Sequence, residues 1–266
     1  MRTIITLAVA SSFALAQASN LSLTNVRPTY GLLGPVRANT QVLPGDSLGL
    51  EFDIEGITIA ADGKVQYSIG LDVTDEKGKV AYRQLPRDLE ASASLGGKAV
   101  AAQAQLDIGL DQPAGDYTVK VTVTDRAAKQ SQSVTQKVQV LPAEFGIVQL
   151  RTTSDPEGVV PAGLVGVGET LWISFAAVRF ERDKGKLQPN VQFELRILDE
   201  AGKPTLTKPD SGTINQDVPA GDKLLGGQFQ VALNRPGKFV VELKATDKVS
   251  GKTATRSFPL NVLPRR

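Results

Sequence analysis

The chain has 266 residues, of which 41% are hydrophobic and 22% are charged, and its formal net charge is +2. These values are ordinary for a soluble globular protein, and 25 glycines and 15 prolines supply turns without making the chain low in complexity or disordered. Lysine and arginine are interspersed with aspartate and glutamate, so neither nucleic acid nor an anionic membrane surface is an expected partner.

Histidine and cysteine are absent from the sequence. The chain therefore cannot form a Ser-His-Asp triad, a thiol nucleophile, a zinc-finger site or a histidine-ligated metal site. Carboxylate-pair hydrolysis and Ser-Lys chemistry stay open, although nothing singles out one pair among the 28 acidic residues. We expect a protein that is not an enzyme and that has no catalytic residue, cofactor or metal ion.

Residues 1–18 are typical of a secretory signal peptide. Arg2 precedes an apolar run over 4–15, and the Ala-Gln-Ala sequence of 16–18 matches the small-x-small pattern of a cleavage site. The apolar run is shorter than the roughly 20 residues that span a bilayer, which argues against a membrane anchor. We expect cleavage after Ala18 and an exported protein that is periplasmic, at the cell surface or extracellular, with no integral membrane segment in the mature chain.

One stretch of the sequence occurs twice. Residues 113–142 and 235–264 share a glycine, an aspartate turn and a closing Leu-Pro, at positions that differ by 122 in residue number. Both stretches alternate apolar and polar residues on either side of a polar turn, which predicts a β-hairpin. Gly45-Asp46 and Gly168-Glu169 match in the same way further upstream, so we expect two copies of one domain.

Period-2 alternation continues through both copies, and no helical period is sustained. We expect about seven strands per copy, at the spacing typical of a sandwich. In the comparison of the two copies, 95–97 (Leu-Gly-Gly) matches 225–227, and Leu106 matches Phe229.

The fold class that follows is all-β: two tandem immunoglobulin-like antiparallel β-sandwiches after the signal peptide. We place the first sandwich at 19–142 and the second at 143–266, because Pro142 ends one ladder and only a few residues precede the next strand. A linker this short predicts a fairly extended, semi-rigid pair.

The longest departures from the strand pattern are 85–99 and 205–223, which we expect to be loops at equivalent ends of the two sandwiches. The first has residues suited to a short helical turn, and the second carries three prolines and is expected to be irregular. Loops in such places commonly carry binding surfaces. The alternative is that they are solvated connections whose sequence is free to vary.

Trp172 is the only tryptophan and the one candidate partner-binding residue. It falls on the strand face opposite Leu171 and Ile173, where it could stack on a sugar or a partner protein. The alternative is that it packs against the other copy or its own loop.

Calcium is a second candidate ligand, since acidic residues gather near predicted strand ends. The dense Asp/Asn loop of an EF-hand is missing, and hairpin-capping roles are the favoured interpretation of Asp125 and Asp247. The acidic residues concerned are Asp72, Asp75, Glu76, Asp125 and Asp247.

The Gly-x-Tyr and Gly-x-Phe corners, the Thr-Asp strand ends and the closing Leu-Pro together resemble bacterial immunoglobulin-like domains, especially the polycystic-kidney-disease type. Such domains serve as spacers, adhesins, stalks and substrate-binding appendages. The whole chain also resembles an uncharacterised group of exported bacterial proteins of planctomycetal type. Val119 and Val241 stand where antibody-type domains have the second cysteine. Tyr117 can form the tyrosine-corner hydrogen bond of these domains, whereas Phe239 cannot.

We therefore expect an exported, non-enzymatic binding, adhesive or envelope-structural protein whose partner is an envelope or extracellular protein or a glycan. The alternative is a carbohydrate-binding or carboxylate-dependent hydrolytic protein.

Overall fold

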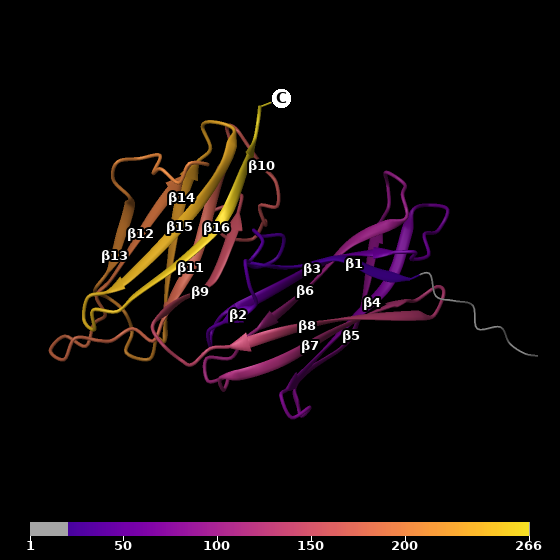
Figure 1. Cartoon of the computed structure of the whole chain (residues 1–266), viewed down its shortest axis with the longest axis horizontal. Helices are drawn as coiled ribbons and strands as arrows, with labels where there is room; N and C mark the ends of the chain where they lie inside the picture. The colour runs from indigo at the N-terminus through magenta and orange to yellow at the C-terminus, as the bar shows by residue number, and fades with distance from the viewer. Residues whose placement is uncertain (1–20, 266) are drawn as a thin grey trace, which may run out of the picture.

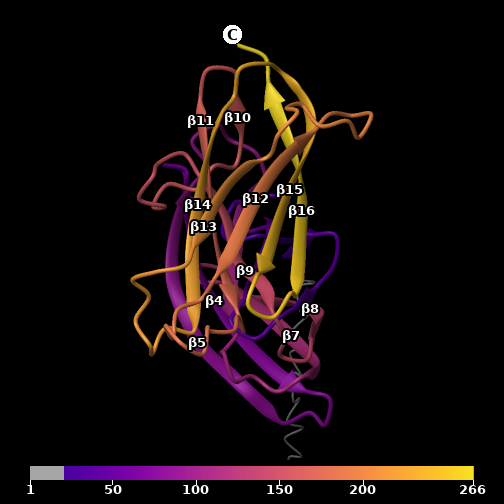
Figure 2. The same ribbon diagram turned by 90° about the vertical axis from the view of Figure 1, so that its left-hand side faces the viewer.

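The computed structural model of the chain describes residues 21–265, so the predicted signal peptide at 1–18 lies outside the described residues. The described chain is all-β, as predicted, and contains no helix between residues 21 and 265. Two β-sandwiches lie next to each other, with their strands running in clearly different directions (Figure 1). In Figure 2 the second sandwich stands in front of the first.

The first sandwich consists of a three-stranded sheet in the order β1-β3-β6 and a five-stranded sheet in the order β2-β8-β7-β4-β5. All neighbouring strands are antiparallel except β2, which makes a two-residue parallel pairing with β8. The strands are β1 (Ser22–Thr29), β2 (Gln41–Val42), β3 (Ser47–Glu55), β4 (Lys64–Asp75), β5 (Val80–Ser92), β6 (Ala99–Asp107), β7 (Gly115–Asp125) and β8 (Gln130–Val140).

The second sandwich repeats this plan, with sheets in the orders β14-β11-β9 and β10-β16-β15-β12-β13, and with a parallel pairing of β10 and β16. The chain changes from one sandwich to the other between Val140 and Gly146. The boundary placed at Pro142 stays a prediction. The strands are β9 (Gly146–Thr153), β10 (Val165–Gly166), β11 (Thr170–Val178), β12 (Val191–Leu198), β13 (Asp210–Ile214), β14 (Leu224–Ala232), β15 (Gly237–Asp247) and β16 (Thr253–Leu263).

Alternating side chains of the central strands form the core of each sandwich, as the period-2 pattern predicts. On β7 and β15 every second residue is buried while the residues between are partly or fully exposed. The buried residues are Tyr117, Val119, Val121 and Val123 on β7 and Phe239, Val241, Leu243 and Ala245 on β15.

Asp125 ends β7 and caps the hairpin that leads into β8. Its Oδ1 accepts hydrogen bonds from the backbone N–H groups of Ala127 and Ala128 at 2.9 and 3.0 Å, and its Oδ2 accepts one from Thr58 at 2.7 Å. The predicted turn role is confirmed. Burial raises the pKa of Asp125, but the hydrogen bonds from Ala128, Thr58 and Ala127 outweigh it and hold the pKa below its usual value of 3.8.

Asp247 has the same role at the end of β15. It accepts hydrogen bonds from the Val249 backbone, the Ser250 hydroxyl and the Glu181 backbone at 3.0, 2.6 and 2.9 Å. In both sandwiches one buried carboxylate thus ties a hairpin to the loop that follows the second strand of the three-stranded sheet.

The tyrosine corner forms in the first sandwich only. The Tyr117 hydroxyl donates to the carbonyl of Pro113 at 3.0 Å and accepts from Gln112 at 2.8 Å. In the second sandwich Arg235 stands where the first has Pro113, and its guanidinium carbon lies 5.0 Å from the centre of the Phe239 ring. A cation–π contact therefore replaces the hydrogen bond that Phe239 cannot make.

The two expected loops are partly strands. Strand β5 extends through Ser92 and pairs with β4 along its length, so the helical turn expected in 85–99 is wrong. In 205–223, strand β13 pairs with β12. Pairing with a neighbouring strand overrides the weak helical preference of the isolated segment.

The predicted match of 95–97 with 225–227 is also wrong. Residues 95–97 lie in the turn before β6, whereas 225–227 lie inside β14. The backbone hydrogen bonds of Ile108 to Asp46 and of Leu233 to Glu169 align 225–227 with 100–102, so the predicted match is displaced by five residues.

The structure contains no helix in 21–265 that is long and apolar enough to cross a bilayer.

The two sandwiches meet at a joint whose buried centre is the ion pair of Arg37 and Asp46. Arg37 Nη2 lies 3.0 Å from Asp46 Oδ2, and the two side chains are only 2% and 3% exposed. Arg37 also donates to the carbonyls of Ser47 and Gln41 at 3.0 and 2.9 Å. Its guanidinium carbon lies 4.6 Å from the centre of the Tyr30 ring.

The same residues reach the second sandwich. Asp46 Oδ1 accepts a hydrogen bond from the Gln149 backbone at 2.9 Å, and the Gln149 side chain donates to the carbonyl of Gly45 at 3.1 Å. The Tyr30 ring joins the core of the second sandwich, with its centre 6.2 Å from that of Phe258. An apolar cluster completes the joint and consists of Leu43, Val148, Ala176 and Val178 with Leu110, Leu141 and Leu224 packed against them.

We expect Asp46→Ala to lower the free energy of unfolding by about 3–5 kcal/mol, because it leaves Arg37 buried without its partner. Urea unfolding followed by circular dichroism measures the loss. The matched control is Glu169→Ala, which changes the equivalent but exposed residue of the second sandwich and should cost less than about 1 kcal/mol. Equal losses for the two variants would contradict the central role of the ion pair.

We expect Asp125→Asn to cost about 2 kcal/mol at pH 7, because an amide replaces a carboxylate that accepts three hydrogen bonds. Because the pKa of Asp125 is lower in the folded protein, the carboxylate stabilises the fold at pH values above its pKa in the unfolded chain. This stabilisation is lost as the pH falls through the pKa of the folded protein. The difference from the wild type should therefore shrink below about pH 4.

Urea unfolding at a series of pH values measures this difference. Asp116→Asn, a change of an exposed carboxylate on the same strand, should stay within about 0.5 kcal/mol of the wild type. A loss for Asp125→Asn that is the same at pH 7 and in acid would show that the charge of the carboxylate is not involved.

Candidate binding groove

Trp172 lies on the outer face of the sheet β14-β11-β9, opposite the buried Leu171 and Ile173, as predicted. It is half-buried, and its cross-strand neighbours are Thr153 and Gln230. Its role in partner binding stays a prediction.

The acidic residues considered for calcium are held in turns and ion pairs. Asp75 Oδ1 accepts hydrogen bonds from the backbone of Lys77 and Lys79, and Asp72 pairs with Arg83. No group of three or more acidic side chains that could hold a metal ion occurs within residues 21–265.

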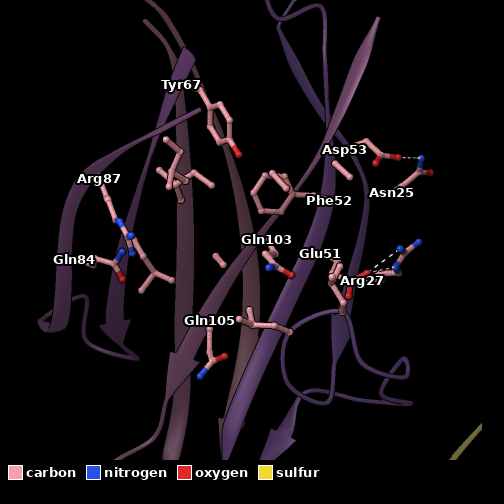
Figure 3. A pocket seen from close by; sticks show the side chains of 18 residues that line it. Asn25, Arg27, Glu51, Phe52, Asp53, Tyr67, Gln84, Arg87, Gln103 and Gln105 are labelled. Carbon is pink, nitrogen blue, oxygen red and sulfur yellow. Dashed lines mark hydrogen bonds and ion pairs between the residues drawn. The ribbon is translucent and has the colours of Figure 1, made fainter. Parts of the chain in front are cut away.

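A groove of about 590 Å³ follows β6 in the first sandwich. Figure 3 shows Tyr67, Arg87 and Gln84 on one side of it, Arg27 on the other, and Gln103 between them. The groove therefore has walls of two kinds, one facing the gap between the two sheets and one formed by the outer face of the sheet β1-β3-β6.

The inner wall is mainly apolar, with Gln84 and Arg87 of β5 on the same side. Its side chains come from β3, β4, β5 and β6, and most of them belong to the core of the first sandwich. Arg87 and Leu89, from the stretch first expected to be a loop, line the same side. The apolar lining consists of Phe52, Tyr67, Ile69, Leu71, Leu89, Ala102 and Ala104.

The outer wall is polar, and β1 holds its carboxylates in place. Arg27 donates to Glu51 Oε2 from Nε and Nη2 at 3.0 and 2.8 Å, and Asn25 donates to Asp53 at 2.7 Å. The other carboxylate oxygen of Glu51 and the amide oxygen of Gln103 are buried and have no hydrogen-bond partner. Glu51 and Gln103 are direct cross-strand neighbours.

Strand β6 is the edge of its sheet, and no strand within residues 21–265 pairs with its outer side. The Gly56 N–H bonds the Lys98 carbonyl at 3.2 Å, and the Ile108 N–H bonds the Asp46 carbonyl at 2.8 Å. The backbone N–H and C=O groups of the even-numbered residues along β6 therefore point toward β3. The residues whose N–H and C=O groups point to the free edge are therefore Ala99, Ala101, Gln103, Gln105 and Asp107.

The second sandwich has the same edge and a hollow of about 440 Å³ on its outer face beside Gly227 and Gln228, but the gap between its two sheets is filled. The Ile108 N–H bonds the carbonyl of Asp46, and the Leu233 N–H bonds that of Glu169, the counterpart of Asp46. Ile108 and Leu233 are therefore equivalent. The same alignment along β6 and β14 makes Ala104 equivalent to Phe229. Phe229 stacks on Phe175 with 5.7 Å between ring centres, and Phe175 contacts Phe193 at 4.9 Å. An alanine in the first sandwich thus leaves open what a phenylalanine fills in the second.

The polar pair also differs between the copies. Ser174 and Gln228 occupy the places of Glu51 and Gln103, and the Gln228 side chain donates to the Ser174 hydroxyl at 3.0 Å. In the second sandwich these two side chains are therefore hydrogen-bonded to each other. In the first sandwich one oxygen of Glu51 and the amide oxygen of Gln103 have no hydrogen-bond partner.

Sequence comparison missed this groove because it matched Leu106, rather than Ala104, with Phe229. With the alignment that the hydrogen bonds give, the change from a large to a small core residue is visible in the sequence. Nothing in the sequence indicated which of the two alignments is right.

No protein-family model matches the chain, and no curated protein matches it. The polycystic-kidney-disease type and the planctomycetal grouping therefore stay predictions.

Several solved structures are similar to the chain over most of its length, at low TM-scores. Red sea bream transglutaminase shares 11% identity at a TM-score of 0.30, with 94% of this chain and 32% of that chain covered. The C-terminal domain of the Streptococcus agalactiae antigen I/II polypeptide BspA shares 10% at 0.30, with 89% and 99% covered. The C-terminal domain of the Streptococcus pyogenes antigen I/II-family protein AspA shares 12% at 0.29, with 90% and 100% covered.

The chain thus spans about a third of the length of the transglutaminase. At these TM-scores no function of the chain follows from any of the three proteins.

We expect Ala104→Phe to leave the free energy of unfolding unchanged or to raise it by up to about 1 kcal/mol, because the new ring enters an open groove. The reverse change in the second sandwich, Phe229→Ala, should cost about 3–5 kcal/mol. Thermal and urea unfolding measure both. A loss of more than about 2 kcal/mol for Ala104→Phe, as overpacking produces, would show that the groove is closed.

Proposed function

We propose that the protein is an exported, non-enzymatic binding or adhesive module of the cell envelope and that it recognises its partner through the groove beside β6. The observation that carries this proposal is the open groove in the first sandwich at a place where the second sandwich is filled by Phe229. The two sandwiches differ at this core position, and the smaller residue leaves the gap between the sheets open beside β6 in the first sandwich.

The chemistry of the groove favours binding over catalysis. The ionised groups on its outer wall are held by neighbours on β1, Glu51 by Arg27 and Asp53 by Asn25. The sequence has no histidine or cysteine to supply a nucleophile or a proton shuttle. An apolar wall with a few convergent polar groups is the usual composition of a recognition site.

The joint supports an adhesive or spacer role. The buried Arg37–Asp46 pair and the inserted Tyr30 ring restrict rotation between the sandwiches. A rigid pair holds the groove in a fixed orientation relative to the second sandwich, which can then serve as a stalk. Export follows from the signal-peptide pattern of 1–18.

The test is affinity capture with the purified mature protein as bait and envelope and secreted fractions of the source cells as prey, after chemical crosslinking. We expect the wild type and Trp172→Ala to capture the same partner and Ala104→Phe to lose it, because the new ring occupies the groove.

Each other outcome counts against part of the proposal. Capture that Ala104→Phe leaves intact would remove the groove from recognition, and capture that Trp172→Ala abolishes would move the site to the outer face of the second sandwich. A bait that captures nothing from any fraction would contradict the binding function itself. Unfolding curves of both variants confirm that they are folded.

A further inference from the structure

We infer that the groove binds an extended polypeptide strand, which pairs with the free edge of β6 and places a basic side chain beside Glu51. The inference rests on the proposed function and names its ligand class. It follows from the backbone of β6, from the two walls of the groove and from their charges.

The free edge of β6 offers a row of unpaired backbone donors and acceptors along nine residues. Natural sheets protect such edges with charged side chains, prolines or bulges. Strand β5, the other edge on this side, carries Pro86 and two exposed arginines, Arg83 and Arg87, and its pairing with β4 is interrupted by bulges. Between Lys98 and Asp107, in contrast, β6 has no charged residue and no proline.

The two walls match the alternation of an added strand. A strand paired with β6 points successive side chains to opposite faces of the sheet, so every second one enters the gap beside Ala102 and Ala104. The side chains between them lie on the outer face beside Gln103. An apolar slot on one face and a polar row on the other are what β-strand addition needs for specificity.

The outer wall selects for positive charge. Glu51 and Asp53 line the groove from the outer face of β3, and Glu55 follows them on the same face. The groove-lining cations are Arg27, which pairs with Glu51, and Arg87 on the opposite wall. Because Arg27 bonds only one oxygen of Glu51, the second oxygen, which is buried and unpartnered, remains for a donor on the ligand. A lysine or arginine side chain supplies that donor and offsets the acidic charge.

The probe is a synthetic peptide of nine residues, the length of β6, in which valine and lysine alternate. Isothermal titration at physiological salt should show that the peptide binds the wild type. Its affinity for Ala104→Phe should be at least about tenfold lower. A peptide with glutamate in place of lysine should bind at least about tenfold more weakly than the lysine peptide, and Glu51→Gln should reduce that preference.

Two backbone-methylated peptides test the pairing itself. One carries N-methyl groups on the lysines and the other on the valines, so that in each only one edge of the added strand loses its donors. We expect one of the two to lose binding and the other to keep it. A peptide of the same composition with the valines and lysines in separate blocks should not bind, because it lacks alternation.

Tolerance of both methylated peptides, or equal binding by Ala104→Phe, overturns strand addition. If no peptide binds while envelope capture still depends on Ala104, the groove takes another ligand and only this inference fails. A glycan-array signal that Ala104→Phe removes would identify that ligand as carbohydrate. If peptides and capture both fail, the proposed function fails with the inference.

Discussion

The ion pair of Arg37 and Asp46 is the interaction on which the arrangement of the two sandwiches depends. Two charges at 2–3% exposure are costly unless most of their hydrogen-bonding groups find partners, and in this pair the Nε of Arg37 is the one buried group without a partner. Here Asp46 divides its oxygens between Arg37 and the Gln149 backbone of the other sandwich. The guanidinium in turn holds Tyr30, whose ring lies in the second core. This buried ion pair thus connects the first sandwich to the backbone and the core of the second.

The two sandwiches share one strand order but differ at individual positions. Asp46 is buried at the joint, while its counterpart Glu169 is exposed and its side chain accepts a hydrogen bond from Gly166 in its own turn. Likewise Phe229 completes an aromatic cluster that Ala104 leaves incomplete. The shared alternation maintains both cores, and changes at single positions distinguish the joint and the groove from their counterparts.

Much of the fold was predictable because hydrophobic alternation is a local property. The buried faces of β7 and β15 and the aspartate caps at Asp125 and Asp247 follow from spacing and turn chemistry alone. Stretch 85–99 was mistaken for a loop because its exposed residues show little alternation, and only pairing with β4 makes it a strand. The groove escaped notice because a two-residue shift between β6 and β14 leaves the alternation unchanged.

The sequence by itself determined an all-β chain and excluded histidine and cysteine chemistry, and it predicts a repeated hairpin and a signal peptide. These depend on composition and on contacts between residues close in the chain. The tertiary structure alone decided that Tyr30 packs in the second core, that Arg37 and Asp46 meet at the joint, and that β6 borders an open groove. Each of these depends on which strands become neighbours across the sandwiches, and period-2 alternation specifies the face of a strand but not its partner.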